Sequence, residues 1–190
     1  GKAYIKERYQ KPGEAYLGLV HRLDRPVGGV VAFARTSKSA ARLAASMQKG
    51  DWQKNYRAVV CGLPKEDKGT CADYLRQDEK TRFSAVCAET EPGAKLAKLS
   101  YHVLARCGQE NLSLISIALF TGRHHQIRVQ FASRGLPVWG DARYNSGSFP
   151  GQQIALWADR LKIVHPTKRE ALGFVSPPPD MYPWNLFMEE

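Results

Sequence analysis

The stretch His21-Arg22-Leu23-Asp24-Arg25-Pro26-Val27-Gly28-Gly29 is the densest cluster of chemically capable side chains in this 190-residue chain. Its one carboxylate, Asp24, lies between two arginines, which favour the ionised form. The chain then continues into Val27–Arg35, an apolar run bounded by glycines that predicts a buried strand. An oriented, ionised aspartate can be a nucleophile, a general base or a metal ligand. The alternative is a structural turn held by salt bridges, which is the more common role of an isolated Arg-x-Asp-Arg sequence.

The residues that follow predict a helix and a second strand. After Ser37, apolar residues recur at helical spacing, namely Ala40, Leu43, Ala44 and Met47. Gly50 then stands where a C-terminal helix cap belongs. Tyr56–Cys61 is apolar and predicts a strand.

Further strands are predicted in the second half of the chain. Lys98–Arg106 alternates between apolar and polar residues and Leu112–Leu119 is apolar, so the two predict a hairpin. Pro64–Lys80 is polar and predicts an excursion at the surface. Short late strands are expected at Leu161–Val164 and Leu172–Val175.

These elements predict an α+β fold with a mixed, largely antiparallel central sheet and inserted helices and loops. The chain has no internal repeat and no low-complexity tract. Its length suits one domain, so we expect residues 1–190 to form a single domain.

A second chemical cluster is Thr121-Gly122-Arg123-His124-His125-Gln126-Ile127-Arg128-Val129. Arg123 and Arg128 offer planar forks of donors that suit phosphate or carboxylate. Residues 123–134 predict a short helix. Two adjacent histidines cannot share one helix face, and no other histidine completes a ligand pattern, so we expect no metal site. The alternative is a solvated basic helix face.

A third cluster lies on the strand predicted at Tyr56. Lys54 and Tyr56 share one face of that strand because their spacing is two. A tyrosine ring beside a lysine suits stacking on a base under a backbone phosphate. The alternative is a half-buried tyrosine of the core.

The charge balance predicts an anionic partner. The chain has 28 Lys and Arg against 18 Asp and Glu, a net charge of +10, and residues 1–60 alone carry twelve basic and four acidic groups. Such asymmetry most often indicates nucleic acid, although on charge alone a basic protein without a polyanionic partner is as good an interpretation.

Several classes of protein are excluded by what the sequence lacks. No apolar run approaches the roughly 18 residues of a membrane span, and the N-terminus is not that of a signal peptide. The cysteines form no Cys-x-x-Cys pair, which predicts thiols in a reducing cytoplasm; they are Cys61, Cys71, Cys87 and Cys107. Phosphate-binding glycine loops, GxSxG and HExxH are absent from the sequence, so we expect no nucleotide cofactor and no common hydrolase site.

Together the three clusters resemble the RluA family of RNA pseudouridine synthases. His21–Gly29 is similar to that family's His-Arg-Leu-Asp-Arg motif, and residues 121–128 to its Thr-Gly-Arg-x-His-Gln-Ile-Arg motif. Residues 54–56 resemble its Lys-x-Tyr strand, and residues 140–144 and 161–166 its later landmarks. All occur in the family's order.

The chain departs from the family pattern in several places. Gly28 replaces the usual serine of the turn, so a hydroxyl is lost. Gln130 replaces the histidine that usually ends the second motif, which we expect to change a peripheral contact. We find no counterpart of the family's opening strand and Lys-Pro-x-Gly segment, and none of an S4-type RNA-binding module. We therefore expect that the chain begins late in the catalytic domain.

The resemblance implies the pseudouridine synthase fold and the isomerisation of specific uridines in structured RNA, an rRNA or tRNA stem-loop, without cofactor or metal. It implies that Asp24 is the catalytic carboxylate and Arg128 its cationic partner. Tyr56 would pack against the target uracil and serve in the late deprotonation at C5. The residues expected to contact RNA are Arg22, Arg25, Lys54, Arg123 and His125. We expect a cytoplasmic monomer with a role in rRNA or tRNA processing; the alternative is a non-catalytic RNA-binding protein on the same fold.

Overall fold

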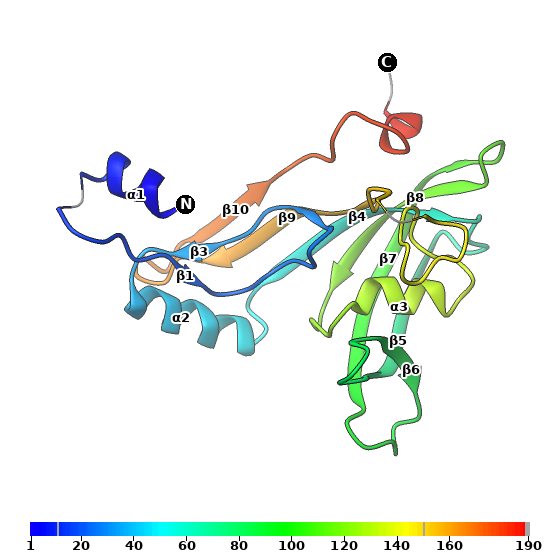
Figure 1. Ribbon diagram of the computed structural model, residues 1–190, viewed down its shortest axis with the longest axis horizontal. Coiled ribbons are helices and arrows are strands. Elements are labelled where there is room, and N and C mark those ends of the chain that lie inside the picture. Colours follow the sequence, from blue (N-terminus) through cyan, green and yellow to red (C-terminus); the bar gives the residue numbers. More distant parts are fainter. Residues whose placement is uncertain (11, 150, 189–190) are drawn as a thin grey trace.

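The computed structural model describes residues 1–10, 12–149 and 151–188, and its centre is an eight-stranded sheet (Figure 1). The strands are β2 (Gly28–Gly29), β4 (Gln53–Cys61), β5 (Lys68–Gln77), β6 (Ser84–Cys87), β7 (Lys95–Cys107), β8 (Leu112–Leu119), β9 (Leu156–Val164) and β10 (Ala171–Val175). Their order is β10-β9-β4-β8-β7-β5-β6, and β2 pairs with β9 off this path. Every pairing is antiparallel except that of β2 with β9. The prediction of an α+β fold with a mixed, largely antiparallel sheet is confirmed.

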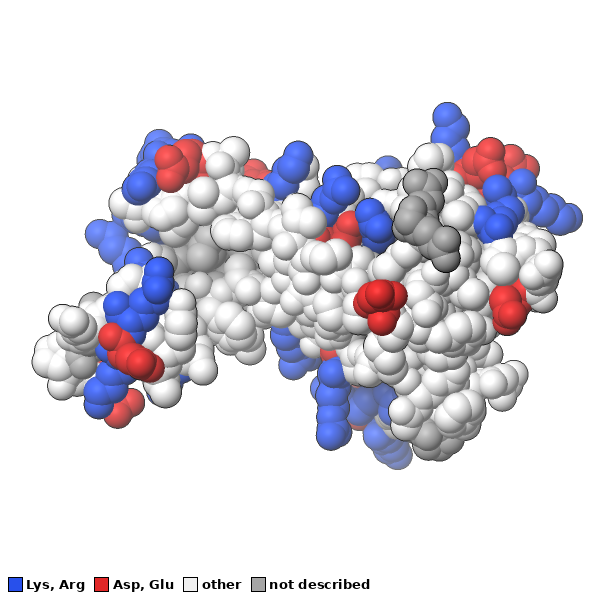
Figure 2. Space-filling view, turned by 90° about the horizontal axis from the view of Figure 1, so that it is seen from above, with Lys and Arg blue, Asp and Glu red and all other residues white. Residues whose placement is uncertain are grey.

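The N-terminal elements gather at one end of this sheet (Figure 1). They are α1 (Lys2–Arg8), the two-stranded sheet of β1 (Gly18–Leu19) and β3 (Phe33–Ala34), and α2 (Ser37–Gln48). Thr36 caps α2 by accepting a hydrogen bond from the Ser39 amide, and Leu43 is buried in a cluster with Trp52. The helix predicted from Ser37 is confirmed. Lys and Arg side chains are prominent at this end of the molecule (Figure 2).

Alternate residues of a strand point to opposite faces of the central sheet, and each face packs against another part of the chain. On one face, α3 (Gln126–Ala132) places Ile127 and Phe131 in a cluster with Leu99, Ile115 and Ile117. On the other face, the short 3-10 helix η1 (Trp184–Phe187) places Trp184 in a cluster with Val59, Leu112, Leu114 and Ala155. Helix α3 thereby lies against the strands that hold the candidate site.

The single buried strand expected at Val27–Arg35 is wrong. The chain makes two short strands there: β2 pairs with β9, and β3 pairs with β1. The change of direction occurs at Gly29, whose φ is +117°, and a Cβ there would lie 2.2 Å from the Ala158 carbonyl oxygen. Only glycine fits such a close approach of two backbones.

The surface excursion expected at Pro64–Lys80 is also wrong. Most of it is β5, which pairs with β7 from Lys68 opposite His102 to Leu75 opposite Lys95. Cys71 and Leu75 are buried in the core, whereas the other side of the strand is polar. Long-range pairing stabilises this strand, and its own composition gives little sign of that pairing.

The other predicted elements are confirmed with small shifts of their bounds. The predicted hairpin is formed by β7 and β8, and the late strands are β9 and β10. Helix α3 is shorter than residues 123–134 because residues 122–125 form an irregular loop, in which His125 has a φ of +52°. No helix in the described ranges has the length and apolar character that crossing a membrane requires.

Candidate active site

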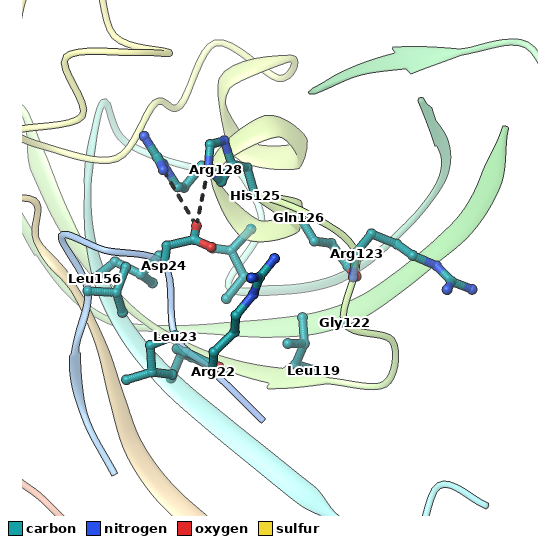
Figure 3. A pocket seen from close by; sticks show the side chains of 13 residues that line it. Arg22, Leu23, Asp24, Leu119, Gly122, Arg123, His125, Gln126, Arg128 and Leu156 are labelled. Atoms are coloured by element: carbon teal, nitrogen blue, oxygen red, sulfur yellow. Dashed lines mark hydrogen bonds and ion pairs between the residues drawn. The ribbon is translucent and has the colours of Figure 1, made fainter. Parts of the chain in front are cut away.

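A pocket of about 100 Å³ lies where the His21–Gly29 loop, β4, the end of β8 and the start of α3 meet (Figure 3). Its apolar wall is formed by Leu23, Val27, Leu119, Ile127 and Leu156. The polar groups of Asp24, Tyr56 and Arg128 also line it. The fold therefore brings together the three residues expected to be catalytic, which come from three separate segments.

Arg128 contacts two carboxylates, and the second was not expected. Its Nη1 lies 3.5 Å from Asp24 Oδ2. Its Nε and Nη2 donate to Asp141 Oδ2 and Oδ1 at 2.8 and 2.6 Å. The Asp141 side chain is 0% exposed, against 27% for Asp24. Asp141 is thus the main partner, and it fixes the guanidinium so that one nitrogen faces Asp24.

Asp141 is in turn held by the turn that follows it. Its Oδ1 accepts hydrogen bonds from the backbone amides of Arg143 and Tyr144 at 3.1 and 3.3 Å. The sequence singled out residues 140–144 as a landmark but gave no sign that Asp141 pairs with Arg128. The one feature of the sequence that could have indicated this role is the position of Asp141, an isolated acid that follows Gly140 in a segment rich in arginine.

His125 faces Asp24 as a neutral ring. Its Nε2 lies 3.9 Å from Asp24 Oδ2, and its Nδ1 hydrogen bonds with the Tyr144 hydroxyl at 2.9 Å. The ring stacks on His124, with centroids 3.7 Å apart. Burial, followed by the charge of Arg128, lowers the pKa of His125 to about 3. At neutral pH this histidine therefore adds no positive charge next to the carboxylate.

Tyr56 lies on β4 at the pocket and keeps its proton. Burial, with a smaller contribution from the charge of Asp24, raises the pKa of Tyr56 to about 12. A phenol with this pKa packs and donates a hydrogen bond at neutral pH, and it is a poor base unless its own proton first leaves.

The other residues expected to bind RNA are spread around the pocket. Arg22 is exposed and lines it, whereas Arg25 is exposed and lies outside it. Among the described residues neither arginine pairs with Asp24, so the flanking arginines do not supply its ion pair. Lys54 lies on β4 outside the pocket lining, and burial lowers its pKa. Arg123 lines the pocket but its side chain points away from Asp24, and its Nε donates to the Leu96 carbonyl at 2.9 Å (Figure 3).

A buried chain of amides supports the loop before α3. Gln126 Oε1 accepts from the Thr121 hydroxyl and the Arg123 amide, and its Nε2 donates to Gln130 Oε1 at 3.1 Å. Gln130 Nε2 donates to Asp73 Oδ2 at 2.6 Å. Gln130 is 0% exposed and does not line the pocket, so the expected change falls on a buried contact outside the site. Its hydrogen bonds connect the wall of the pocket to β5.

Gly28 leads to a first testable prediction. A Cβ at this position would lie 2.1 Å from Trp157 Cζ3, and the indole is fixed by its hydrogen bond to the Ser176 carbonyl at 3.0 Å. The indole thus fills the space that the usual serine side chain would need. Gly28→Ala should lower the free energy of unfolding by about 1–3 kcal/mol through overpacking, and it should reduce activity by shifting the Asp24 turn.

Urea unfolding measures this effect, and two variants control it. Gly108→Ala should be nearly neutral, because a Cβ there would meet nothing within 4 Å. Adding Trp157→Leu to Gly28→Ala should recover part of the lost stability by making room. A Gly28→Ala protein as stable as the Gly108→Ala protein would contradict the proposed packing.

His21 leads to a second prediction, on pH. Its Nε2 accepts a hydrogen bond from the Ala32 amide at 2.9 Å, which needs an unprotonated nitrogen. Burial, then the charge of Lys54, lowers the pKa of His21 below the ordinary 6.5. The resulting stabilisation is complete above pH 6.5 and is lost as the pH falls below that value.

The matched variant is His21→Gln, which keeps an acceptor but cannot titrate. Between neutral pH and about pH 5 its free energy of unfolding should fall less than that of the wild type. Chemical denaturation at several pH values measures the difference. Parallel pH profiles for the two proteins would show that His21 does not contribute.

The site has no recognisable metal centre in the described part of the chain, where no three His, Cys, Asp or Glu residues are grouped to hold an ion. An aspartate on a loop and an arginine on a helix thus meet at one pocket beside a mixed sheet, as the resemblance to RNA pseudouridine synthases predicts.

Comparison with known proteins supports this class. A family model described as RNA pseudouridylate synthase matches residues 2–133. The uncharacterized RNA pseudouridine synthase YhcT of Bacillus subtilis is 35% identical over 179 residues, covering 93% of this chain and 58% of that protein. The dual-specificity RNA pseudouridine synthase RluA of Pasteurella multocida is 30% identical over 177 residues, covering 92% and 77%.

Solved structures agree on the fold. The human RNA pseudouridylate synthase domain containing 1 superposes with a TM-score of 0.75 at 23% identity, covering 94% of this chain and 75% of that one. The chain belongs to the RNA pseudouridylate synthase family, and the resemblance to RluA proteins is confirmed. It spans about three fifths of the length of the first relatives that it matches, 58% for the first two.

Proposed function

We propose that residues 1–190 form a single catalytic domain that converts specific uridines of structured RNA into pseudouridine. The proposed substrates are stem-loops of rRNA or tRNA, and the reaction uses Asp24 without a cofactor. The observation that carries the proposal is the Asp24 carboxylate in a pocket with an apolar wall, contacted by an Arg128 that buried Asp141 holds in place.

The reaction is an isomerisation, so it needs no redox partner and no external group. The bond between C1′ and N1 of the uridine breaks, the uracil turns, and C1′ bonds to C5. The proton that leaves C5 is balanced by the proton that N1 gains. Asp24 would start the reaction by attacking C1′ or by removing a proton from the sugar, and both roles need the carboxylate.

The neighbouring residues fit this chemistry. Arg128 is positioned to stabilise the charge of the Asp24 carboxylate, because Asp141 restrains its guanidinium. Tyr56 would pack against the uracil as a neutral phenol, and its raised pKa of about 12 makes it a poor first choice for the deprotonation at C5. His125 is neutral at working pH and would contact the nucleotide by hydrogen bonding or stacking, not by charge.

The uridine must leave its stack to reach Asp24, which costs a few kcal/mol. The net charge of +10 supports compensating contacts to RNA phosphates. Arg22 lines the pocket and would contact the flipped nucleotide, and we assign Arg25 and Lys54 to the wider RNA surface. We further propose a cytoplasmic monomer, with which the four free thiols are consistent.

The test is to map pseudouridine by mass spectrometry in total RNA from cells with and without this protein. Loss of one or more sites, restored by the wild-type gene, would establish the activity and identify the RNA. No change at any mapped site would contradict the proposal and favour an RNA-binding role on the same fold.

A further inference from the structure

A second and larger hollow adjoins the candidate active site. It encloses about 820 Å³ between the end of β5, the loop that joins β5 to β6, the start of β7 and the loop that precedes α3. Gly122 and Arg123 line both this groove and the Asp24 pocket. The two cavities are therefore separated only by this loop.

Cations dominate the lining of the groove. Arg76, Arg82, Lys95 and Arg123 line it, against the acids Asp78 and Glu79. Arg76 is paired with Glu91 at 2.9 Å, and Asp78 is occupied by hydrogen bonds from Thr81. Within the described ranges Arg82, Lys95 and Arg123 have no carboxylate partner.

The direction of Arg123 connects the groove to the pocket. Its side chain leaves the pocket and extends toward β7, where its Nε donates to the Leu96 carbonyl (Figure 3). This hydrogen bond leaves the two terminal nitrogens of the guanidinium free to bind an anion. Arg123 is therefore placed to bind a group outside the pocket that holds the uridine.

We propose that this groove binds the sugar–phosphate backbone of the RNA strand next to the target uridine, with Arg82, Lys95 and Arg123 contacting its phosphates. The proposal rests on the proposed function, because a strand with one base beside Asp24 must continue across the Gly122–Arg123 loop. Unpaired cations on a broad, exposed groove suit a flexible single strand and its regularly spaced charges. The groove reads no base, so it contributes affinity and not sequence specificity.

The test measures the affinity of the protein for a hairpin RNA with one uridine in its loop, over a range of salt concentrations. The groove variant is Arg82→Asn with Lys95→Gln. Asparagine suits position 82, where φ is +55°, and retains the carbonyl that accepts from Arg143. The control variant is Lys65→Gln with Lys168→Gln, which removes the same charge from exposed positions outside the groove.

We expect the groove variant to bind roughly ten- to a hundredfold more weakly at low salt. The slope of log affinity against log salt should fall by about 1.4 for two lost phosphate contacts on a single strand. The control variant should change both quantities much less. Equal affinities and slopes for the groove and control variants would refute the proposal.

A second arm changes the RNA instead of the protein. Neutral methylphosphonate linkages on either side of the uridine should weaken binding to the wild type and add little to the defect of the groove variant. Fully additive losses would refute the groove contacts. Pseudouridine formation by the wild type is measured separately. If the wild type forms pseudouridine and the groove variant binds RNA as tightly as the wild type, only the groove proposal is refuted. If the groove variant binds RNA more weakly but the wild type forms pseudouridine on no RNA, only the proposed enzymatic function is refuted.

Discussion

Asp24→Asn should reduce pseudouridine formation by roughly a thousandfold or more, because Asp24 carries the one carboxylate among the described residues that line the pocket. The amide has nearly the same shape but cannot attack the sugar or accept a proton from it. RNA affinity should stay within a few-fold of the wild type, since the proposed phosphate contacts lie elsewhere. Single-turnover assays by mass spectrometry measure the rate of pseudouridine formation, and direct binding experiments measure the RNA affinity.

The matched control is Asp180→Asn, which makes the same change at an exposed position away from the pocket. It should retain full activity. The melting temperatures of both variants should be close to that of the wild type, because Asp24 is partly exposed and makes a long ion pair. Substantial pseudouridine formation by Asp24→Asn would remove this residue from the chemistry.

Arg128→Met should have the largest effect on stability. It leaves the carboxylate of Asp141, 0% exposed, without its cation. Breaking a buried ion pair from one side typically costs about 3–5 kcal/mol, which for a chain of this length lowers the melting temperature by roughly 10 °C. Activity should also be lost, because Asp24 loses its cation. Urea and thermal unfolding measure the first effect and single-turnover assays the second.

A second substitution separates the two effects. Asp141→Asn added to Arg128→Met removes the unpaired charge, and the amide oxygen can still accept from the Arg143 and Tyr144 amides. Stability should recover by at least half while activity stays lost. Arg76→Met, at an exposed ion pair with Glu91, should cost no more than about 1 kcal/mol. An Arg128→Met protein no less stable than the Arg76→Met protein would show that the buried pair contributes nothing.

Much of the fold could be predicted from local patterns. Leu112–Leu119 is apolar except for two serines because β8 is covered on both faces, and α2 has its cap, its apolar face and its terminal glycine in order. The segment of β5 could not be predicted in this way. Its partners in β7 lie twenty or more residues away, and its outward side chains are mostly polar.

The candidate site could also be predicted only in part. Motif order predicted that Asp24, Tyr56 and Arg128 meet, and they do. It did not predict that Asp141 holds Arg128, or that Arg123 points away from Asp24, because both depend on side-chain directions set by packing. The expectation that the flanking arginines pair with Asp24 failed for the same reason, because residues that are neighbours in the sequence of a loop need not face each other.

The pairing of β2 with β9 has a consequence for protein synthesis. The loop that carries Asp24 is anchored where Gly28 and Gly29 lie beside Trp157 and Ala158, far along the chain. A ribosome makes Asp24 more than a hundred residues before the strand that holds its loop, because β9 pairs through Trp157 and Ala158. During synthesis the Asp24 loop therefore lacks its anchor until β9 has emerged, and the candidate site cannot assemble before that point.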